Sequence, residues 1–213
     1  MKQEAKRQDP LETVPGSGVL GRISDVLTSY GSNVGSFSID GFSTAVNGVP
    51  GISSSPIIVQ RNGVPPVYIS RNIESLMKKI HNTTDILSNG FFSETWSSTL
   101  LQSLDTSDLL GRAFDQATTT IDFPETMFGQ KLKAVAKLIA TRGERGVDKD
   151  FFYVEMGGYD THASVEENLS TLFTDVNSAF NAFASELKAM DLWNNVTTMQ
   201  VSDFARTLNP NSG

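Results

Sequence analysis

The clearest structural signal in the chain lies at residues 151–190, FFYVEMGGYDTHASVEENLSTLFTDVNSAFNAFASELKAM. Its first six residues are mostly apolar, as in a short buried strand, and two glycines end that strand. Ser164 and Glu167 have the S-x-x-E spacing of a capping box, which predicts that a helix begins at Ser164. Apolar residues at helical spacing extend this helix to about Met190: Leu169, Leu172, Phe173, Val176, Phe180, Phe183 and Leu187.

A second strand is predicted at Val196–Val201 (VTTMQV), which is rich in β-branched residues. A strand, a long helix and a strand in this order form a βαβ unit, which implies parallel strands and a right-handed crossover. A further helix is predicted at Thr126–Thr141, and we expect it to cover the same sheet with an apolar face of Leu132, Val135, Ala136 and Ile139. The sequence therefore indicates an α/β fold with a mostly parallel central sheet flanked by helices.

The first 125 residues give weaker signals. Residues 1–18 are polar and predict a flexible lead-in before a domain that occupies residues 19–213. Residues 31–66 are rich in Gly, Ser, Val and Pro, and we expect an irregular segment at the surface that contains two short β candidates, 35–39 and 56–60. Helices are predicted at 72–80, at 93–119, and at Gly21–Tyr30 with an apolar face of Ile23, Val26 and Leu27.

Composition narrows the classes of function. The net charge is −7 and the 17 Lys and Arg residues are scattered, so the chain has no basic surface typical of nucleic-acid binding. The absence of cysteine excludes disulfides, thiolate zinc sites and cysteine nucleophiles. No apolar run is long enough to predict a membrane span, and the polar N-terminus does not resemble a signal peptide.

Two short segments carry the residues suited to chemistry. In an open parallel sheet, ligands bind beyond the carboxyl ends of the strands. Asp160 and His162 follow the first predicted strand, and Asp203 and Arg206 follow the second. A carboxylate and an imidazole two residues apart suit zinc or another divalent cation, with Asp203 as a third ligand. If the two strands are neighbours, all four side chains converge on one rim of the sheet.

Each of these assignments has a structural alternative. Gly-Gly-x-Asp-Thr is also an ordinary loop between a strand and a helix, and an aspartate there interacts favourably with the helix dipole. From the residues alone, the favoured interpretation of Asp203 and Arg206 is a surface ion pair that has no functional role. Ser202 lacks the G-x-S-x-G context and a positioned base, so it is not assigned as a nucleophile.

The chain resembles the family of domain of unknown function 1501 (DUF1501). The resemblance is strongest over residues 128–213, and three motifs carry it in order: GQKLKAVAKLIATRG at 129–143, VEMGGYDTHA at 154–163 and VTTMQVSDFARTLNPNSG at 196–213. The segments LGRISDVL and PIIVQRNGVPPV match the family more loosely. The family is grouped with the alkaline phosphatase and sulfatase superfamily, so the resemblance implies an alkaline-phosphatase-like sheet with helices on both faces.

The resemblance also implies a metal site. In phosphatases of that superfamily an Asp and a His after such a strand bind one metal, so Asp160 and His162 correspond to metal ligands. Asp203 corresponds more weakly, because Phe204 stands where the superfamily has a second ligand and cannot coordinate. The implied cofactor is a divalent metal such as zinc, calcium or manganese. The implied partner is a small anionic ester substrate, which Arg206 would hold.

The pattern of the family differs from this chain at both ends. Members begin with a Gly-Gly-x-Asp-Gly-like segment and continue into a Gly-Thr-Asp-His-Gly-like motif, and neither is present here. The resemblance therefore implies an internal fragment of an exported, metal-dependent phosphate or sulfate ester hydrolase, inactive as it stands. The alternative is a non-catalytic exported structural or binding protein that keeps the alkaline-phosphatase-like fold.

Overall fold

The computed structural model describes residues 16–53, 55–65, 106–202 and 204. The chain divides into two compact units, residues 1–63 with 117–213 and residues 64–116. The elements of the first unit are, in order, α1 (Val19–Ser29), β1 (Val34–Ile39), η1 (Thr44–Val46), β2 (Ile57–Val59), α4 (Met127–Ala140), α5 (Arg142–Arg145), β3 (Lys149–Val154), α6 (Val165–Ala189) and η2 (Trp193–Asn195).

The second unit is described at residues 64–65 and 106–116, and the latter range is helical. Leu110 and Phe114 are buried in this helix. The helix predicted at 93–119 is therefore confirmed over this part, whereas residues 93–105 and the helix predicted at 72–80 lie outside the described residues. None of the helices in the described ranges is both long and apolar enough to cross a membrane.

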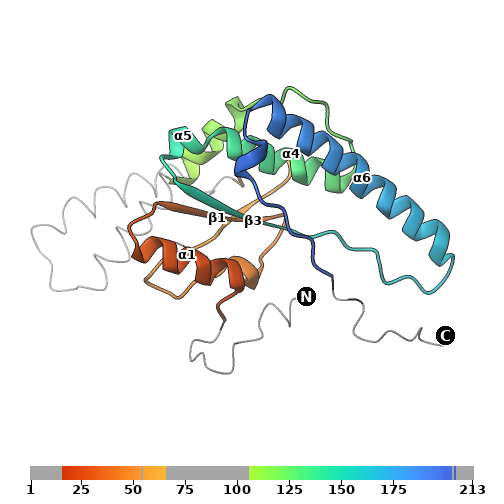
Figure 1. The fold of residues 1–213 in the computed structure, drawn as a ribbon, viewed down its shortest axis with the longest axis horizontal. Coiled ribbons are helices and arrows are strands. Elements are labelled where there is room, and N and C mark those ends of the chain that lie inside the picture. The colour runs from red at the N-terminus through yellow and green to blue at the C-terminus, as the bar shows by residue number, and fades with distance from the viewer. Residues whose placement is uncertain (1–15, 54, 66–105, 203, 205–213) are drawn as a thin grey trace, which may run out of the picture. The chain divides into compact units, whose positions relative to one another are not determined.

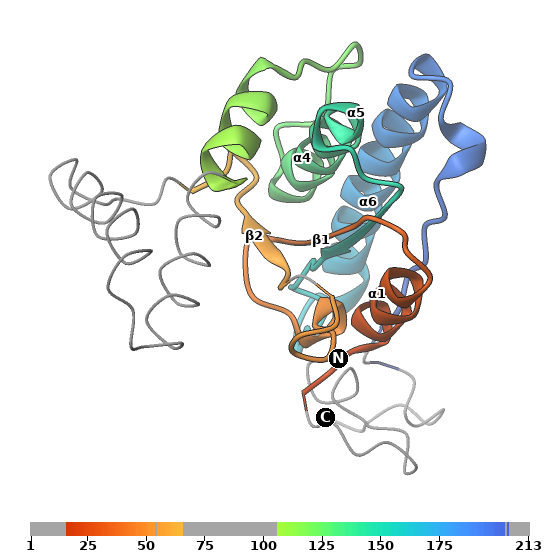
Figure 2. The ribbon, with the colours of Figure 1, turned by 90° about the vertical axis from the view of Figure 1, so that its left-hand side faces the viewer.

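Among the described residues, the sheet of the first unit has three parallel strands in the order β2-β1-β3. Figure 2 shows β1 between the other two strands. Phe37 of β1 is in register with Phe152 of β3, and their rings stack with centroids 5.4 Å apart. The predicted α/β class with a parallel sheet is confirmed. The expectation that residues 31–66 form an irregular surface segment is wrong, because β1 within it is the buried central strand.

Helices cover both faces of this sheet (Figure 1). Helix α1 contacts β1 from one side, and α4, which contacts β1 and β3, lies with α6 on the other side. The α4 helix begins after Thr126, whose side chain accepts a hydrogen bond from the Gly129 N–H at 3.1 Å and so caps the helix. The apolar face predicted for this helix is buried, as expected: Leu132, Val135, Ala136 and Ile139.

Helix α1 is present where it was predicted, but its predicted apolar face is wrong. Val26 is 54% exposed and Ile23 is exposed as well, whereas the buried residues are Gly21, Ser24 and Asp25. The reason is close backbone packing, since a Cβ atom added at Gly21 would lie 1.8 Å from the Asn47 carbonyl oxygen. Gly21 and Ser24 are small enough to lie against this loop, and Asp25 is held inward because its carboxylate accepts hydrogen bonds from the Val49 N–H at 2.7 Å and the Ser53 hydroxyl at 2.5 Å.

Helix α6 has the predicted extent but begins differently. Ser164 has a left-handed backbone (φ 49°) and its side chain caps no helix N–H, so the predicted capping box is wrong. The buried residues of α6 all lie in its C-terminal half: Ala179, Ala182, Phe183, Glu186 and Leu187. The N-terminal half extends past the sheet in Figure 1, and Phe173 there is exposed.

The strand predicted at Val196–Val201 is also wrong. Residues 196–202 follow η2 without forming a strand, and Met199 and Val201 are exposed. The βαβ unit predicted around α6 is therefore not formed. The parallel sheet instead consists of β3 and two strands from the first 60 residues of the chain.

Candidate functional site

The predicted pair Asp160 and His162 lies in the loop between β3 and α6. The loop begins beyond the carboxyl end of β3, as expected, and turns at Gly158 with φ 95°. The His162 Nε2 atom is 3.3 Å from the Asp160 Oδ1 atom. The two side chains are 89% and 82% exposed. The D-x-H spacing therefore brings a carboxylate and an imidazole together at an open surface.

Tyr159, which directly precedes Asp160, anchors this loop to helix α6 and to the end of the β3 segment. Its ring packs against Phe173 of α6 with centroids 6.0 Å apart, and its hydroxyl donates to the Met156 sulfur at 3.5 Å. Burial raises the pKa of the Tyr159 hydroxyl, and the charge of Asp175 raises it further. The tyrosine thus stays neutral and anchored while Asp160, the next residue, points to solvent.

The other two predicted site residues are Asp203, as a third metal ligand, and Arg206, as the residue that holds the substrate anion. Asp203 and Arg206 lie outside the described residues, so their convergence with Asp160 stays a prediction. Within the described part of the chain, no group of three or more His, Cys, Asp or Glu residues is arranged to hold a metal ion. Two donors are half of what a four-coordinate zinc site requires.

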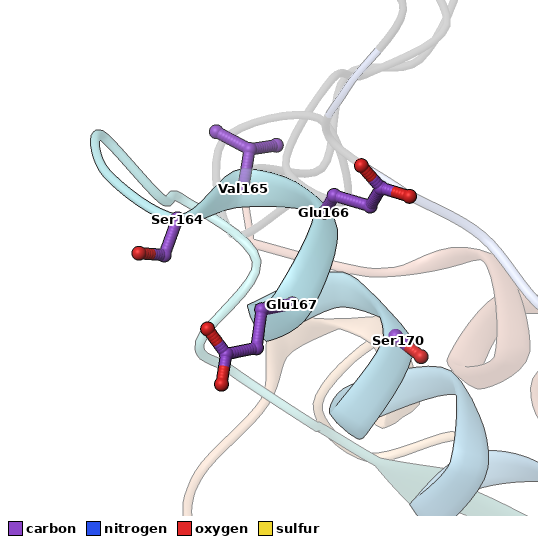
Figure 3. A pocket seen from close by; sticks show the side chains of 5 residues that line it. All are labelled: Ser164, Val165, Glu166, Glu167 and Ser170. Carbon is purple, nitrogen blue, oxygen red and sulfur yellow. The ribbon is translucent and has the colours of Figure 1, made fainter.

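An open hollow lies at the first turn of α6, next along the chain from His162. It is lined by Ser164, Val165, Glu166, Glu167 and Ser170. Figure 3 shows the carboxylates of Glu166 and Glu167 pointing in different directions. They do not converge on a common position, so this hollow offers no second cation site.

A charged cluster that was not predicted from the sequence lies at the carboxyl ends of the strands. We call Asp40, Arg61 and Lys131 the rim cluster. Asp40 directly follows β1 and has a left-handed backbone with φ 60°, which is uncommon for a residue other than glycine. Its carboxylate accepts hydrogen bonds from the Arg61 backbone N–H at 2.8 Å and from the Arg61 guanidinium at 2.7 Å.

Lys131 joins this cluster from the second turn of α4. Its side chain is 11% exposed, and its Nζ atom lies 3.9 Å from the Asp40 Oδ2 atom. The same ammonium donates a hydrogen bond to the Glu155 carbonyl oxygen at 2.9 Å. Because Arg61 follows β2 and Glu155 follows β3, the rim cluster connects the ends of all three strands to α4.

The electrostatics of the rim cluster favour an ionised Asp40. Burial alone would raise the pKa of this carboxyl group, but the two hydrogen bonds from Arg61 and the charges of Arg61 and Lys131 outweigh it. The pKa of Asp40 is therefore lowered from its ordinary value. Two cations surround one carboxylate, which leaves the three-residue cluster with a net positive charge.

Signals for the rim cluster were present in the sequence. Asp40 and Arg61 each follow one of the short β candidates, 35–39 and 56–60, at the position where open parallel sheets bind ligands. Lys131 shares the buried face of its helix with Val135 and Leu138, at spacings i, i+4 and i+7. A charge inside an apolar helix face indicates a buried partner.

The fold is thus an α/β domain whose parallel sheet carries ionisable side chains at its carboxyl rim. The chain belongs to the family described as protein of unknown function (DUF1501), whose model matches residues 98–213. No curated protein and no solved structure matched the chain. The recognised resemblance to this family is confirmed, and the matched range includes both α4 and the Asp160–His162 loop.

Proposed function

We propose that this chain contributes the metal-ligand pair of a metal-dependent phosphate or sulfate ester hydrolase with an alkaline-phosphatase-like fold. Asp160 and His162 are the ligands, Asp203 is the third ligand, and Arg206 holds the anionic group of the ester. The fold and the family match support a parallel α/β scaffold, and the metal role is the step that we add.

The observation that carries this proposal is the distance of 3.3 Å between the Asp160 and His162 side chains. Both side chains are exposed, so a hydrated cation can reach this pair directly from solvent and exchange bound water for the two ligands. Carboxylate oxygen and imidazole nitrogen are donors that zinc and other divalent cations accept in proteins. The donor set therefore fits a divalent metal, although it accounts for only two ligands.

A bound divalent cation would supply Lewis-acid polarisation of a phosphoryl or sulfuryl oxygen. The residues of this chain would position that cation beyond the carboxyl end of β3. The Tyr159 ring, packed on Phe173, would keep the loop in place during this step. Arg206 would orient an anionic ester through paired hydrogen bonds from its planar guanidinium.

The test is hydrolysis of p-nitrophenyl phosphate and p-nitrophenyl sulfate by the full-length gene product. Activity should require added zinc, calcium or manganese and be abolished by a chelator. His162→Ala should reduce it by at least about a hundredfold, the loss expected when a metal ligand is removed. The matched control Glu167→Ala, an exposed acid one turn further along the chain, should retain full activity.

The competing proposal is a non-catalytic exported structural or binding protein with the same scaffold. It predicts that a folded protein hydrolyses neither ester with any of the three metals, and that His162→Ala changes nothing. Metal-independent hydrolysis that survives His162→Ala would contradict the metal role even if the protein is an enzyme.

A further inference from the structure

We propose that the rim cluster is a binding site for a tetrahedral oxyanion, phosphate or sulfate. Arg61 and Lys131 supply the positive charge, and Asp40 is the positioning residue that orients Arg61. The site uses neither Asp160 nor His162. It therefore does not depend on the hydrolase proposal, and either proposal can fail while the other stands.

The position of the rim cluster in the sheet is the first argument. The chain runs from β1 to β2 on one side and then returns past β1 to β3 on the other side. The order of the strands thus reverses at β1, and Asp40 is the residue that follows β1. In open parallel sheets, ligands bind beyond the carboxyl ends of the strands at such a reversal point.

The arrangement of the two cations is the second argument. The Arg61 Nη1 and Lys131 Nζ atoms are 2.7 Å and 3.9 Å from the same Asp40 oxygen, so they lie at most 6.6 Å apart. Two charge-assisted hydrogen bonds of about 2.8 Å, made to different oxygens of one phosphate or sulfate, span that separation. One oxyanion can therefore contact both cations.

Within the described part of the chain, both cations have N–H donors that make no hydrogen bond and are available for such a ligand. An arginine has five N–H donors, and Arg61 directs only Nη1 and its backbone N–H at Asp40. Among the described residues, Lys131 donates one hydrogen bond, to the Glu155 carbonyl oxygen, and its distance from Asp40 is too long for a second. The Arg61 side chain is 45% exposed, so a ligand can approach from solvent.

The charges around the cluster also favour an anion. A purely structural ion pair would match one cation with one carboxylate, whereas Asp40 faces two cations here. Glu155, which directly follows β3, offers Lys131 its backbone carbonyl oxygen. The Glu155 carboxylate instead accepts from the Tyr153 hydroxyl at 3.4 Å. A single positive charge is thus left uncompensated within the cluster.

Asp40 has two opposing effects on a bound anion. Its carboxylate accepts hydrogen bonds from the backbone N–H and the guanidinium of Arg61 and so holds that side chain at the rim, but its negative charge repels the ligand. Asparagine keeps an oxygen that can accept from the Arg61 backbone N–H, and it tolerates a left-handed backbone. Asp40→Asn should therefore keep the arrangement and remove the repulsion, so it should tighten anion binding.

Isothermal titration calorimetry with inorganic phosphate and with inorganic sulfate, on the purified chain at low salt, tests the site. The wild type should bind, and Arg61→Met should weaken binding by about tenfold to a hundredfold. Asp40→Asn should tighten binding by roughly fivefold or more. A parallel titration with phenyl phosphate distinguishes an ester headgroup from the free ion, because a site for esters binds it at least as tightly.

The control is Arg142→Met, which removes an exposed arginine that donates to the Ile139 carbonyl oxygen of its own helical region. It should leave phosphate affinity unchanged. Because Arg61 is largely at the surface, Arg61→Met should fold, and circular dichroism checks this. The proposal is overturned if the folded wild type binds neither ion, if Arg61→Met binds as tightly as wild type, or if Asp40→Asn fails to bind more tightly.

Discussion

The Asp40 carboxylate accepts both the backbone N–H and the guanidinium of Arg61, at 2.8 Å and 2.7 Å. These two hydrogen bonds join the residue after β1 to the second residue after β2. The Asp40 N–H also donates to the Val59 carbonyl oxygen at 2.8 Å, so the β1–β2 pairing continues into the turn. The side chain and the backbone of Asp40 therefore hold the same edge of the sheet together.

This relationship predicts a specific response to acid. The pKa of Asp40 is below its ordinary 3.8 in the folded chain, so its contribution to stability is complete above pH 3.8. That contribution is lost as the pH falls through the lowered pKa. Asp40→Asn should therefore show a smaller loss of unfolding free energy than wild type below pH 3.8. Urea denaturation from pH 2 to 6 measures it, and parallel curves would contradict the assignment.

The close approach of α1 predicts a steric effect at Gly21. A Cβ atom there would meet the Asn47 carbonyl oxygen at 1.8 Å, so Gly21→Ala must displace backbone. We expect it to lower the free energy of unfolding by about 1–3 kcal/mol. Gly143→Ala is the matched control, since a Cβ atom there meets nothing within 4 Å and alanine favours the helix. Equal stability of the two variants would contradict the packing described for α1.

We expect substitution of Glu186 to lower the free energy of unfolding through the loss of a buried hydrogen-bond acceptor. Its buried carboxylate accepts hydrogen bonds from the Thr120 N–H at 2.9 Å and from the Ile121 N–H at 2.7 Å. Glu186→Ala leaves both backbone donors without this acceptor, which should cost about 1–3 kcal/mol. Glu166→Ala, an exposed glutamate on the same helix, should change stability by less than about 0.5 kcal/mol. Thermal unfolding followed by circular dichroism compares the two variants.

Local patterns were sufficient to predict several elements. The apolar spacing of residues 126–141 predicted both α4 and its buried face, because that face packs on the sheet and on α6. The run FFYV predicted β3, which forms because it pairs with β1 over six residues. The helical period after Ser164 predicted α6 to within one residue at each end.

Other features depended on contacts that no local pattern encodes. Val196–Val201 has the composition of a strand, yet strand formation depends on a partner, and it has none among the described residues. The apolar residues of α1 predicted its buried face wrongly, because backbone contact with Asn47 favours glycine and serine there. The Ser164 side chain does not cap α6, because the backbone of Ser164 is left-handed.

The candidate site was also predicted only in part, because some of its residues are close in sequence and others are brought together by the fold. Asp160 and His162 are two residues apart, so their proximity could be inferred from spacing alone, and they lie in contact. Asp40, Arg61 and Lys131 come from two β–loop junctions and a helix that are separated by up to 91 residues. Only the order of the strands brings them together, and the two β candidates at 35–39 and 56–60 were expected within an irregular surface segment.

We expect that replacing Asp160 and His162 leaves the free energy of unfolding unchanged. Both side chains are more than four-fifths exposed, and exposed substitutions usually change stability by less than about 0.5 kcal/mol. The double variant Asp160→Ala/His162→Ala should therefore unfold at the same urea concentration as wild type. A large loss of stability would indicate that the pair is a structural contact.

The most direct test of the metal proposal is elemental mass spectrometry of the full-length gene product after dialysis against metal-free buffer. We expect stoichiometric zinc, calcium or manganese in the wild type, loss of that metal in Asp160→Ala/His162→Ala, and retention in the Glu166→Ala/Glu167→Ala control. A folded wild type that contains none of these metals, or a double variant that keeps the metal, would contradict the assignment of Asp160 and His162 as ligands.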